Sequence, residues 1–243
     1  MSDKKTAIIT GAGRGLGKSI AQSLAKEGLI VLICSRTETE LIDVRNLIVS
    51  AGGECHYFIV DVTDKDAVRN FVRIVLEMHG QIDILVNNAG WSNKEEFLEE
   101  ISYDDYKKCF STNIDSIFYI MKEVLPNMKK NKKGLIINMT SGAGKTGRQK
   151  LAVYSASKFA IRGLTEAVGR ELEGTGVTCI SLIPLGGFNT ALRAELFGKE
   201  DAEKQKSPDL IGEAVKNIVL GKIEVNNGDS VLVKKEGIEI IRD

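Results

Sequence analysis

The sequence predicts a single α/β domain over residues 1–243, built on a doubly wound parallel sheet of about seven strands with helices on both faces. Short runs rich in Ile, Val and Leu recur along the chain, helical patterns separate them, and no Pro/Ser-rich linker interrupts the alternation. Uninterrupted apolar runs are typical of parallel strands that are buried on both faces. The expected strands are Ala7–Thr10, Ile30–Cys34, His56–Val60, Ile82–Asn87, Leu135–Met139, Val177–Ile183 and a last one around Ser230–Val233.

The segments between these strands carry the periodicity of amphipathic helices. After the first strand, Leu16, Ile20 and Leu24 fall on one helical face. The strand–helix alternation favours right-handed crossovers between parallel strands. Residues 191–207 are charged and break the strand pattern, so we expect a mobile flap there, followed by a helix that begins near Pro208.

Charge and cysteine usage narrow the class of protein. The 33 basic and 33 acidic side chains cancel, whereas a nucleic-acid or anionic membrane partner would favour a basic excess. The four cysteines show no metal-ligand spacing, and with two histidines a metal site is not expected. No apolar run has the length of a membrane span, and the start of the chain lacks a signal-peptide pattern. We therefore expect a cytoplasmic, metal-free protein that acts on small molecules, with no nucleic-acid or membrane partner.

A glycine-rich loop, "GAGRGLGKS" (Gly11–Ser19), joins the first strand to the first helix. Backbone N–H groups at a helix N-terminus attract phosphate oxygens, and glycines let the backbone approach them closely. From Thr10, the spacing T-G-x-x-x-G-x-G suits a dinucleotide. From Ala12, the loop is one residue short of a nucleoside-triphosphate P-loop, with Lys18 on the phosphates and Ser19 on magnesium. The loop by itself leaves both interpretations open.

The end of the second strand favours a dinucleotide and indicates which one. An acid about 20 residues beyond the loop would bind the free 2′-hydroxyl of NAD. This sequence has Ser35 and Arg36 there, and a guanidinium suits a 2′-phosphate. Arg14, inside the glycine loop, could reach the same phosphate. The sequence therefore predicts NADP(H) in preference to NAD(H).

Tyr154 and Lys158 share one face of a predicted helix in the stretch "YSASK". A nearby ammonium favours the phenolate, so we expect Lys158 to lower the pKa of Tyr154 from its ordinary value of about 10. Such a phenol could exchange a proton with a carbonyl or an alcohol. Ser141 ends the preceding strand, where its hydroxyl could hydrogen-bond a substrate oxygen. Asn113 either belongs to this site or only satisfies a local backbone carbonyl.

Together these motifs resemble the short-chain dehydrogenase/reductase family from Thr10 to about Leu220. "TGAGRGLG" resembles its cofactor loop, and "NNAG" (Asn87–Gly90) resembles its sheet-stabilising signature. The resemblance implies a Rossmann fold and NAD(P)-linked hydride transfer between the nicotinamide and a ketone or secondary alcohol. The chain is similar in this respect to 3-oxoacyl thioester reductases and general carbonyl reductases. It also implies a homodimer or homotetramer.

The resemblance implies roles for individual residues. Tyr154 would be the general acid/base, and Lys158 would bind the nicotinamide ribose and lower the pKa of Tyr154. Ser141 would position the carbonyl, and Asn113 would hold a water in a proton relay. The implied cofactor contacts are Gly11, Gly13, Arg14, Gly15, Leu16, Ser35, Arg36, Asp61, Val62, Asn88, Ala89, Gly90, Tyr154, Lys158, Phe188 and Thr190.

Two segments depart from the family pattern. In "IPLGGFNT", Leu185 stands where the family has proline, so the turn near Phe188 and Thr190 is expected to differ in shape. The tail lacks the glycine-rich ending that often helps to build the subunit contact. A P-loop NTPase, with Asp61 as its magnesium-side aspartate, and a non-catalytic NADPH-binding sensor are the alternatives.

Overall fold

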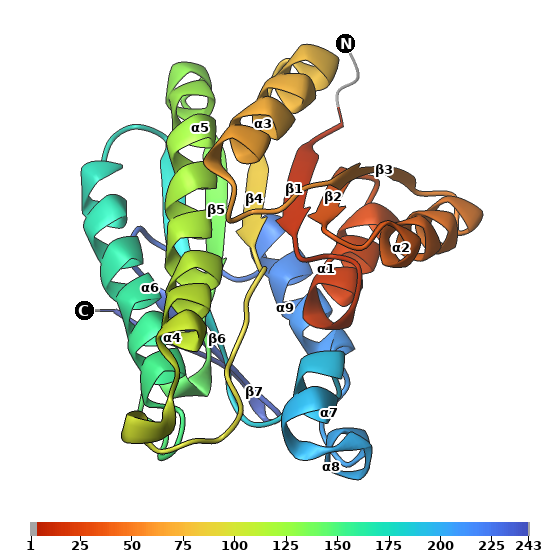
Figure 1. Cartoon of the computed structure of the whole chain (residues 1–243). Helices are drawn as coiled ribbons and strands as arrows, with labels where there is room; N and C mark the ends of the chain where they lie inside the picture. Colours follow the sequence, from red (N-terminus) through yellow and green to blue (C-terminus); the bar gives the residue numbers. More distant parts are fainter. Residues whose placement is uncertain (1–3, 243) are drawn as a thin grey trace.

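One eight-stranded sheet lies at the centre of the computed structural model, which describes residues 4–242 (Figure 1). Its strands are β1 (Thr6–Thr10), β2 (Ile30–Ser35), β3 (Glu54–Ile59), β4 (Ile84–Asn87), β5 (Gly134–Met139), β6 (Val177–Pro184), β7 (Ser230–Lys234) and β8 (Gly237–Ile241). Their order is β3-β2-β1-β4-β5-β6-β7-β8, and β1 to β7 are parallel. The order reverses between β1 and β4, which creates a crevice at the carboxyl ends of these strands. The predicted doubly wound parallel sheet is therefore confirmed.

Helices cover both faces of this sheet (Figure 1). One face carries α1 (Gly15–Lys26), α2 (Glu38–Ser50) and α9 (Asp209–Val219). The other face carries α3 (Lys65–His79), α5 (Ser116–Asn131) and α6 (Ala152–Glu171). The shorter elements are α4 (Tyr103–Phe110), a π-helical turn (Ser111–Asp115), 3-10 turns at Leu98–Glu100 and Gly142–Gly144, α7 (Ala191–Phe197) and α8 (Lys199–Glu203).

The inner strands are mainly apolar because helices cover both faces of the sheet. Successive side chains of a strand point to opposite faces. In β1, Ile9 belongs to the core beneath α1 and α9, and Ile8 belongs to the core beneath α3 and α5. Both side chains are fully buried. Burial of one such side chain contributes about 1.5–3 kcal/mol, so the two cores hold the strand ends in fixed positions.

Two segments differ from the sequence prediction. Residues 191–207, expected as a flap, contain the short helices α7 and α8, which meet at Gly198 with a φ of 89°. Thr190 caps the N-terminus of α7, where its Oγ1 accepts a 3.2 Å hydrogen bond from the N–H of Arg193. The sequence did not predict β8, which pairs antiparallel with β7 and places Ile240 opposite Val231.

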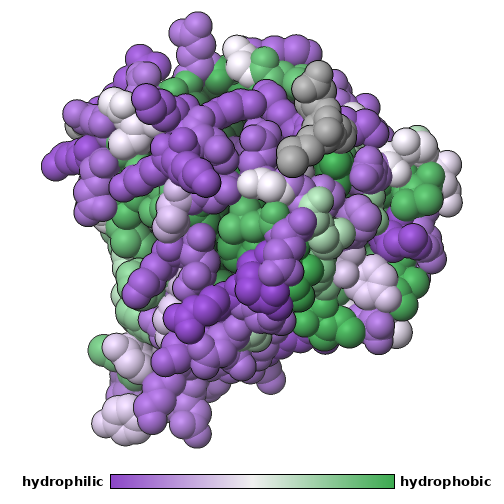
Figure 2. Space-filling view, turned by 90° about the horizontal axis from the view of Figure 1, so that it is seen from above, coloured by the Kyte–Doolittle hydropathy of each residue, from purple (hydrophilic) through white to green (hydrophobic). Residues whose placement is uncertain are grey.

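The end of the molecule opposite α7 and α8 is mainly hydrophilic, with smaller hydrophobic patches (Figure 2). Among residues 4–242, no helix is long and apolar enough to span a bilayer. The same residues contain no group of three or more His, Cys, Asp or Glu side chains placed to hold a metal ion. Met1 to Asp3, part of the start that lacks a signal-peptide pattern, lie outside the described residues, as does Asp243.

Candidate active site

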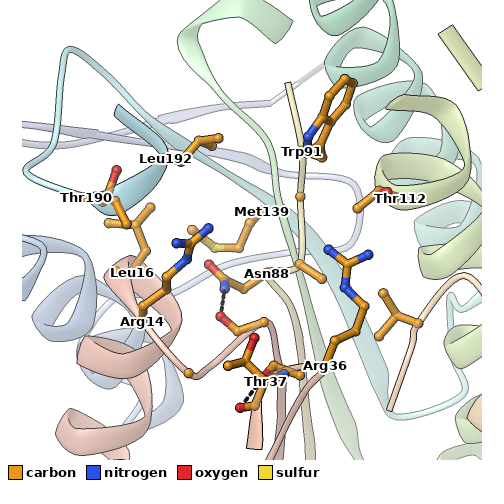
Figure 3. Close-up of a pocket in the computed structure, with 18 of the residues that line it drawn as sticks. Arg14, Leu16, Arg36, Thr37, Asn88, Trp91, Thr112, Met139, Thr190 and Leu192 are labelled. Carbon is orange, nitrogen blue, oxygen red and sulfur yellow. Dashed lines mark hydrogen bonds between the residues drawn. The ribbon is translucent and has the colours of Figure 1, made fainter. Parts of the chain in front are cut away.

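A cleft of about 340 Å³ opens at the carboxyl ends of β1, β2, β4 and β5, beside α7 (Figure 3). This is the position at which doubly wound sheets bind their ligands. Of the residues predicted to contact a cofactor, the following line it: Gly11, Gly13, Arg14, Gly15, Leu16, Ser35, Arg36, Asp61, Val62, Asn88, Ala89, Gly90, Tyr154, Lys158 and Thr190. Phe188 is the exception.

The glycine loop and the loop after β4 form one unit. Gly11 has a φ of 61°, and a Cβ there would lie 2.8 Å from the Cα of Ala89. The Asn88 side-chain amide donates to the carbonyl oxygens of Thr10 and Gly11, at 3.0 and 3.1 Å. A Cβ on Gly17 would lie 2.5 Å from the Asn88 Nδ2, so this contact also requires glycine. The packing aims the start of α1 at the cleft.

The N-terminus of α1 is suited to phosphate. Its N-cap residue, Arg14, makes no side-chain capping hydrogen bond, so it leaves the first backbone N–H groups without that partner. Gly11, Gly13 and Gly15 line the cleft and present no Cβ to a ligand. Backbone donors and the helix dipole together attract an anion at such a site.

Five charged residues form one end of the cleft, which we call the arginine end: Arg14, Arg36, Glu40, Asp61 and Glu195. Figure 3 shows Arg14 and Arg36 extending into the cleft. The Nη1 of Arg14 lies 2.8 Å from the Oε1 of Glu195 in α7, and its Nε lies 4.0 Å from the Oε1 of Glu40 in α2. The Nη1 of Arg36 lies 4.0 Å from the Oδ2 of Asp61. Each guanidinium therefore has an acidic neighbour.

Asp61 is held by the turn that follows β3. Its Oδ1 accepts hydrogen bonds from the N–H and the Oγ1 of Thr63, at 2.9 and 2.7 Å. Burial raises the pKa of Asp61, but these hydrogen bonds and the charge of Arg36 outweigh it, and the pKa lies below its ordinary value. The carboxylate is thus ionised at neutral pH, and Thr63 fixes its orientation.

At the opposite end of the cleft, Tyr154 and Lys158 line the wall, and we call these two residues, with Ser141 beside them and Asn113 behind them, the tyrosine end. Lys158 Nζ lies 5.7 Å from the centroid of the Tyr154 ring and donates a 3.2 Å hydrogen bond to the carbonyl oxygen of Met139. Tyr154 is hydrogen-bonded to Ser141. Tyr154 and Lys158 line the cleft, and Ser141 is half-buried beside them. The helix spacing and the strand end therefore bring these three side chains together.

Asn113 lies behind this group and is fully buried. Its Oδ1 accepts from the N–H of Trp91 at 2.8 Å, and its Nδ2 donates to the carbonyl oxygen of Trp91 at 2.9 Å and to Ser157 Oγ at 2.8 Å. Ser157 Oγ in turn donates to the carbonyl oxygen of Tyr154 at 2.8 Å. Asn113 thus joins the loop after β4 to α6 from a π-helical turn, a feature frequent at functional sites. Its water-holding role stays a prediction.

The protonation equilibria at the tyrosine end differ from the sequence prediction. Burial raises the pKa of Tyr154, and the hydrogen bond with Ser141 offsets only part of this effect. Burial also lowers the pKa of Lys158 to about 8. The expected fall in the Tyr154 pKa is therefore wrong for this structure, because desolvation of the phenolate outweighs the favourable interactions.

The family model for short chain dehydrogenase matches residues 5–201. The chain belongs to the short-chain dehydrogenase family. This short-chain dehydrogenase is 33% identical over 229 residues to the NADPH-dependent pterin aldehyde reductase of Arabidopsis thaliana, covering 94% of this chain and 93% of that protein. It is accordingly an NAD(P)-dependent oxidoreductase, and binding of the dinucleotide at the glycine loop stays a prediction. The P-loop interpretation is wrong, and Lys18 does not line the cleft.

Solved structures also resemble this short-chain dehydrogenase, and two of them illustrate its cofactor class. A metagenomic short-chain oxidoreductase in complex with NADP shares 29% identity at a TM-score of 0.82, over 94% of this chain and 96% of that chain. The 3-ketoacyl-(acyl-carrier-protein) reductase of Brucella melitensis, complexed with NADH, shares 27% identity at a TM-score of 0.86, over 94% of this chain and 96% of that chain. Similar folds therefore hold either form of the cofactor.

Phe188 is the one residue predicted to contact the cofactor that does not line the cleft of this short-chain dehydrogenase. Its side chain is 6% exposed and packs in the core beneath α1 and α9 instead of lining the cleft. A short parallel bridge joins Phe188 to Lys206, and the ring gains free energy by leaving water. Thr190, two residues later, does line the cleft.

The cleft also contains residues that the sequence prediction missed: Thr37, Glu40, Val60, Thr63, Trp91, Thr112, Met139, Thr140, Ala191, Leu192 and Glu195. Several are chain neighbours of predicted residues, as Thr112 is of Asn113 and Thr140 is of Ser141. Adjacency to a strand end was a usable signal for these. Glu40 and Glu195 lie on helices outside any motif, and no local signal pointed to them.

Proposed function

We propose that this short-chain dehydrogenase transfers a hydride between NADP(H) and a ketone or secondary alcohol, with Tyr154 as general acid/base. The observation that carries this proposal is the placement of Tyr154, hydrogen-bonded to Ser141, on the wall of the cleft into which the glycine loop opens. We further propose that residues 1–243 act as one cofactor-binding and catalytic domain.

The proposed chemistry divides between cofactor and chain. A bound nicotinamide would supply the hydride, and the carbonyl carbon of the substrate would accept it. Ser141 orients the carbonyl oxygen, and Tyr154 gives its phenolic proton to that oxygen. The raised pKa of Tyr154 keeps the phenol protonated at neutral pH, as a proton donor requires. Lys158, whose pKa is about 8, remains mostly an ammonium at neutral pH and holds the nicotinamide ribose.

The proposed substrates are small carbonyl compounds, with 3-oxoacyl thioesters and other ketones first among them. Similarity to the Brucella melitensis reductase and to the Arabidopsis thaliana reductase supports this range. The preference for NADP(H) rests on Arg14 and Arg36, both of which line the cleft. A homodimer or homotetramer stays a prediction from the family resemblance.

The test is the loss of NADPH absorbance with a panel of 3-oxoacyl thioesters, aldehydes and simple ketones. We expect Tyr154→Phe to lower kcat by about 10²–10⁴-fold with an unchanged Kd for NADPH, because it removes only the proton donor. Tyr106→Phe is the matched control, since Tyr106 is an exposed residue of α4 that does not line the cleft. Equal rates in wild type and Tyr154→Phe would remove Tyr154 from the mechanism. NADPH binding without turnover of any carbonyl would favour the non-catalytic sensor.

A further inference from the structure

Glu40 brings a carboxylate to the edge of the cleft where β2 ends. It lies in the first turn of α2, five residues after Ser35, and it lines the cleft. A Cβ placed on Gly13 would be 2.8 Å from the Oε2 of Glu40 and 3.3 Å from the Oγ of Ser35. The carboxylate of Glu40 and the hydroxyl of Ser35 therefore both approach the same point of the glycine loop.

The chemistry of this edge decides between the two nicotinamide cofactors. In dinucleotide sites, a carboxylate near the end of the second strand accepts a hydrogen bond from the free 2′-hydroxyl of adenosine, and an arginine accommodates the 2′-phosphate. The end of β2 offers Ser35 and Arg36 and no acid. Glu40 supplies the missing carboxylate from the neighbouring helix, where it would repel a phosphate.

The charges around Glu40 make this repulsion matter. Arg14 lies 4.0 Å from Glu40 and 2.8 Å from Glu195, and Arg36 lies 4.0 Å from Asp61. A 2′-phosphate must therefore compete with a carboxylate for each guanidinium. A 2′-hydroxyl has no such competition and can donate to Glu40.

We propose that Glu40 is a specificity-determining residue that weakens binding of the 2′-phosphorylated cofactor and lets the enzyme use NADH as well as NADPH. The inference rests on the proposed function in placing the adenosine of the cofactor at the arginine end. It concerns binding alone, and it does not depend on Tyr154 or on the identity of the carbonyl substrate.

The experiment is isothermal titration calorimetry of the full-length chain with NADPH and NADH in the absence of a carbonyl substrate. We expect Glu40→Gln to lower the Kd for NADPH about five- to tenfold, since it removes one partly exposed like charge. The Kd for NADH rises or stays constant, because the amide is a weaker acceptor for the 2′-hydroxyl. We repeat the comparison without the nicotinamide by titrating adenosine 2′,5′-bisphosphate and adenosine 5′-diphosphate. We expect Glu40→Gln to lower the Kd of the bisphosphate alone, because only that ligand carries a 2′-phosphate.

Two variants control for a merely structural role. Glu38 lies in the same turn of α2, accepts a 3.3 Å hydrogen bond from the Tyr57 hydroxyl and does not line the cleft. We expect Glu38→Gln to leave both Kd values unchanged. Glu40→Asp keeps the charge, and we expect it to retain the weak binding of NADPH.

The outcomes separate this inference from the proposed function. An equal change in both Kd values, or an unchanged NADPH/NADH ratio in Glu40→Gln, overturns the role of Glu40. If Glu40→Asp binds NADPH as tightly as Glu40→Gln, charge is not the cause and the inference also fails. Absence of carbonyl turnover in the wild type would refute the proposed reaction and leave these binding results standing.

Discussion

Different kinds of interaction stabilise the tyrosine end and the arginine end of the cleft. At the tyrosine end, Asn113 is fully buried and makes neutral hydrogen bonds of 2.8–2.9 Å to Trp91 and Ser157. At the arginine end, the paired side chains of Arg14 and Glu195 are 51% and 56% exposed. Buried hydrogen bonds are costly to break and weakly screened, whereas exposed ion pairs contribute about 0–1 kcal/mol and are screened by salt. The tyrosine end is therefore rigid, and the arginine end is adjustable.

The rigidity of the tyrosine end extends into the sheet. Asn87 of β4 donates a 2.7 Å hydrogen bond to Asn138 of β5, which donates a 3.0 Å bond to Thr165 of α6. All three side chains are buried. This chain of bonds ties the helix that carries Tyr154 and Lys158 to the two central strands, so their positions follow those of the sheet.

The largest expected effect would break the tyrosine end. Asn113→Leu removes hydrogen bonds to Trp91 and Ser157 and leaves their buried polar atoms unsatisfied. We expect the free energy of unfolding to fall by about 4 kcal/mol, measured by urea denaturation. Asn131→Ala, at an exposed asparagine of α5, is the control and should change it by less than about 0.5 kcal/mol. Similar midpoints for the two variants would contradict a rigid tyrosine end.

The second prediction uses the buried charge at the same end. Burial lowers the pKa of Lys158 from 10.5 to about 8, so the folded chain releases this proton before the unfolded chain does. Below pH 8 the buried ammonium destabilises the fold, and this penalty fades as pH rises from about 8 to 10.5. Lys158→Met lacks the penalty.

We therefore expect Lys158→Met to be more stable than wild type by an amount that is largest below pH 8 and shrinks by about 3 kcal/mol toward pH 10.5. Urea unfolding of both proteins across this range measures the difference. The titration of tyrosines and thiols that lie away from Lys158 is the same in both proteins and cancels. A difference that stays constant with pH would show that Lys158 is solvated.

A smaller effect would sharpen the contrast from the arginine end. Arg36→Asp replaces a charge that attracts a 2′-phosphate with one that repels it and accepts from a 2′-hydroxyl. We expect the NADPH/NADH ratio of kcat/KM to fall about tenfold or more, less so at high salt. Arg73→Asp makes the same charge change on the exposed surface of α3 and serves as the control. A ratio that does not move in Arg36→Asp removes Arg36 from cofactor choice.

Most of the sheet could be predicted because β1, β2 and β4 to β7 are mainly buried and largely apolar, and because β3, although only partly buried, ends in a short apolar run. The edge strand β8 could not, since Gly237 to Glu239 are exposed and no such run marks them. Its pairing with β7 depends on tertiary contact. Residues 191–207 were recognised as irregular from their charge, but α7 and α8 are too short to show a helical period, and the cap at Thr190 sets where α7 begins.

At the candidate site, local spacing predicted proximity but not environment. The i, i+4 spacing brought Tyr154 near Lys158, as expected. The direction of the Tyr154 pKa depends on burial by distant segments, so the spacing could not predict it. The ion pair between Arg14 and Glu195 joins residues that are far apart in the sequence, and no motif marks the glutamate.

Trp91 gives this cleft a built-in optical reporter. It is the single tryptophan of the chain, it lines the cleft, and the Lys108 ammonium lies 4.4 Å from its ring centroid. Reduced nicotinamides absorb in the range where an indole emits, so we expect a reduced cofactor bound in this cleft to quench the Trp91 fluorescence without any label. Because no other indole contributes, emission excited selectively at the indole reports on this one cavity and offers a way to follow cofactor exchange in real time on the unmodified chain.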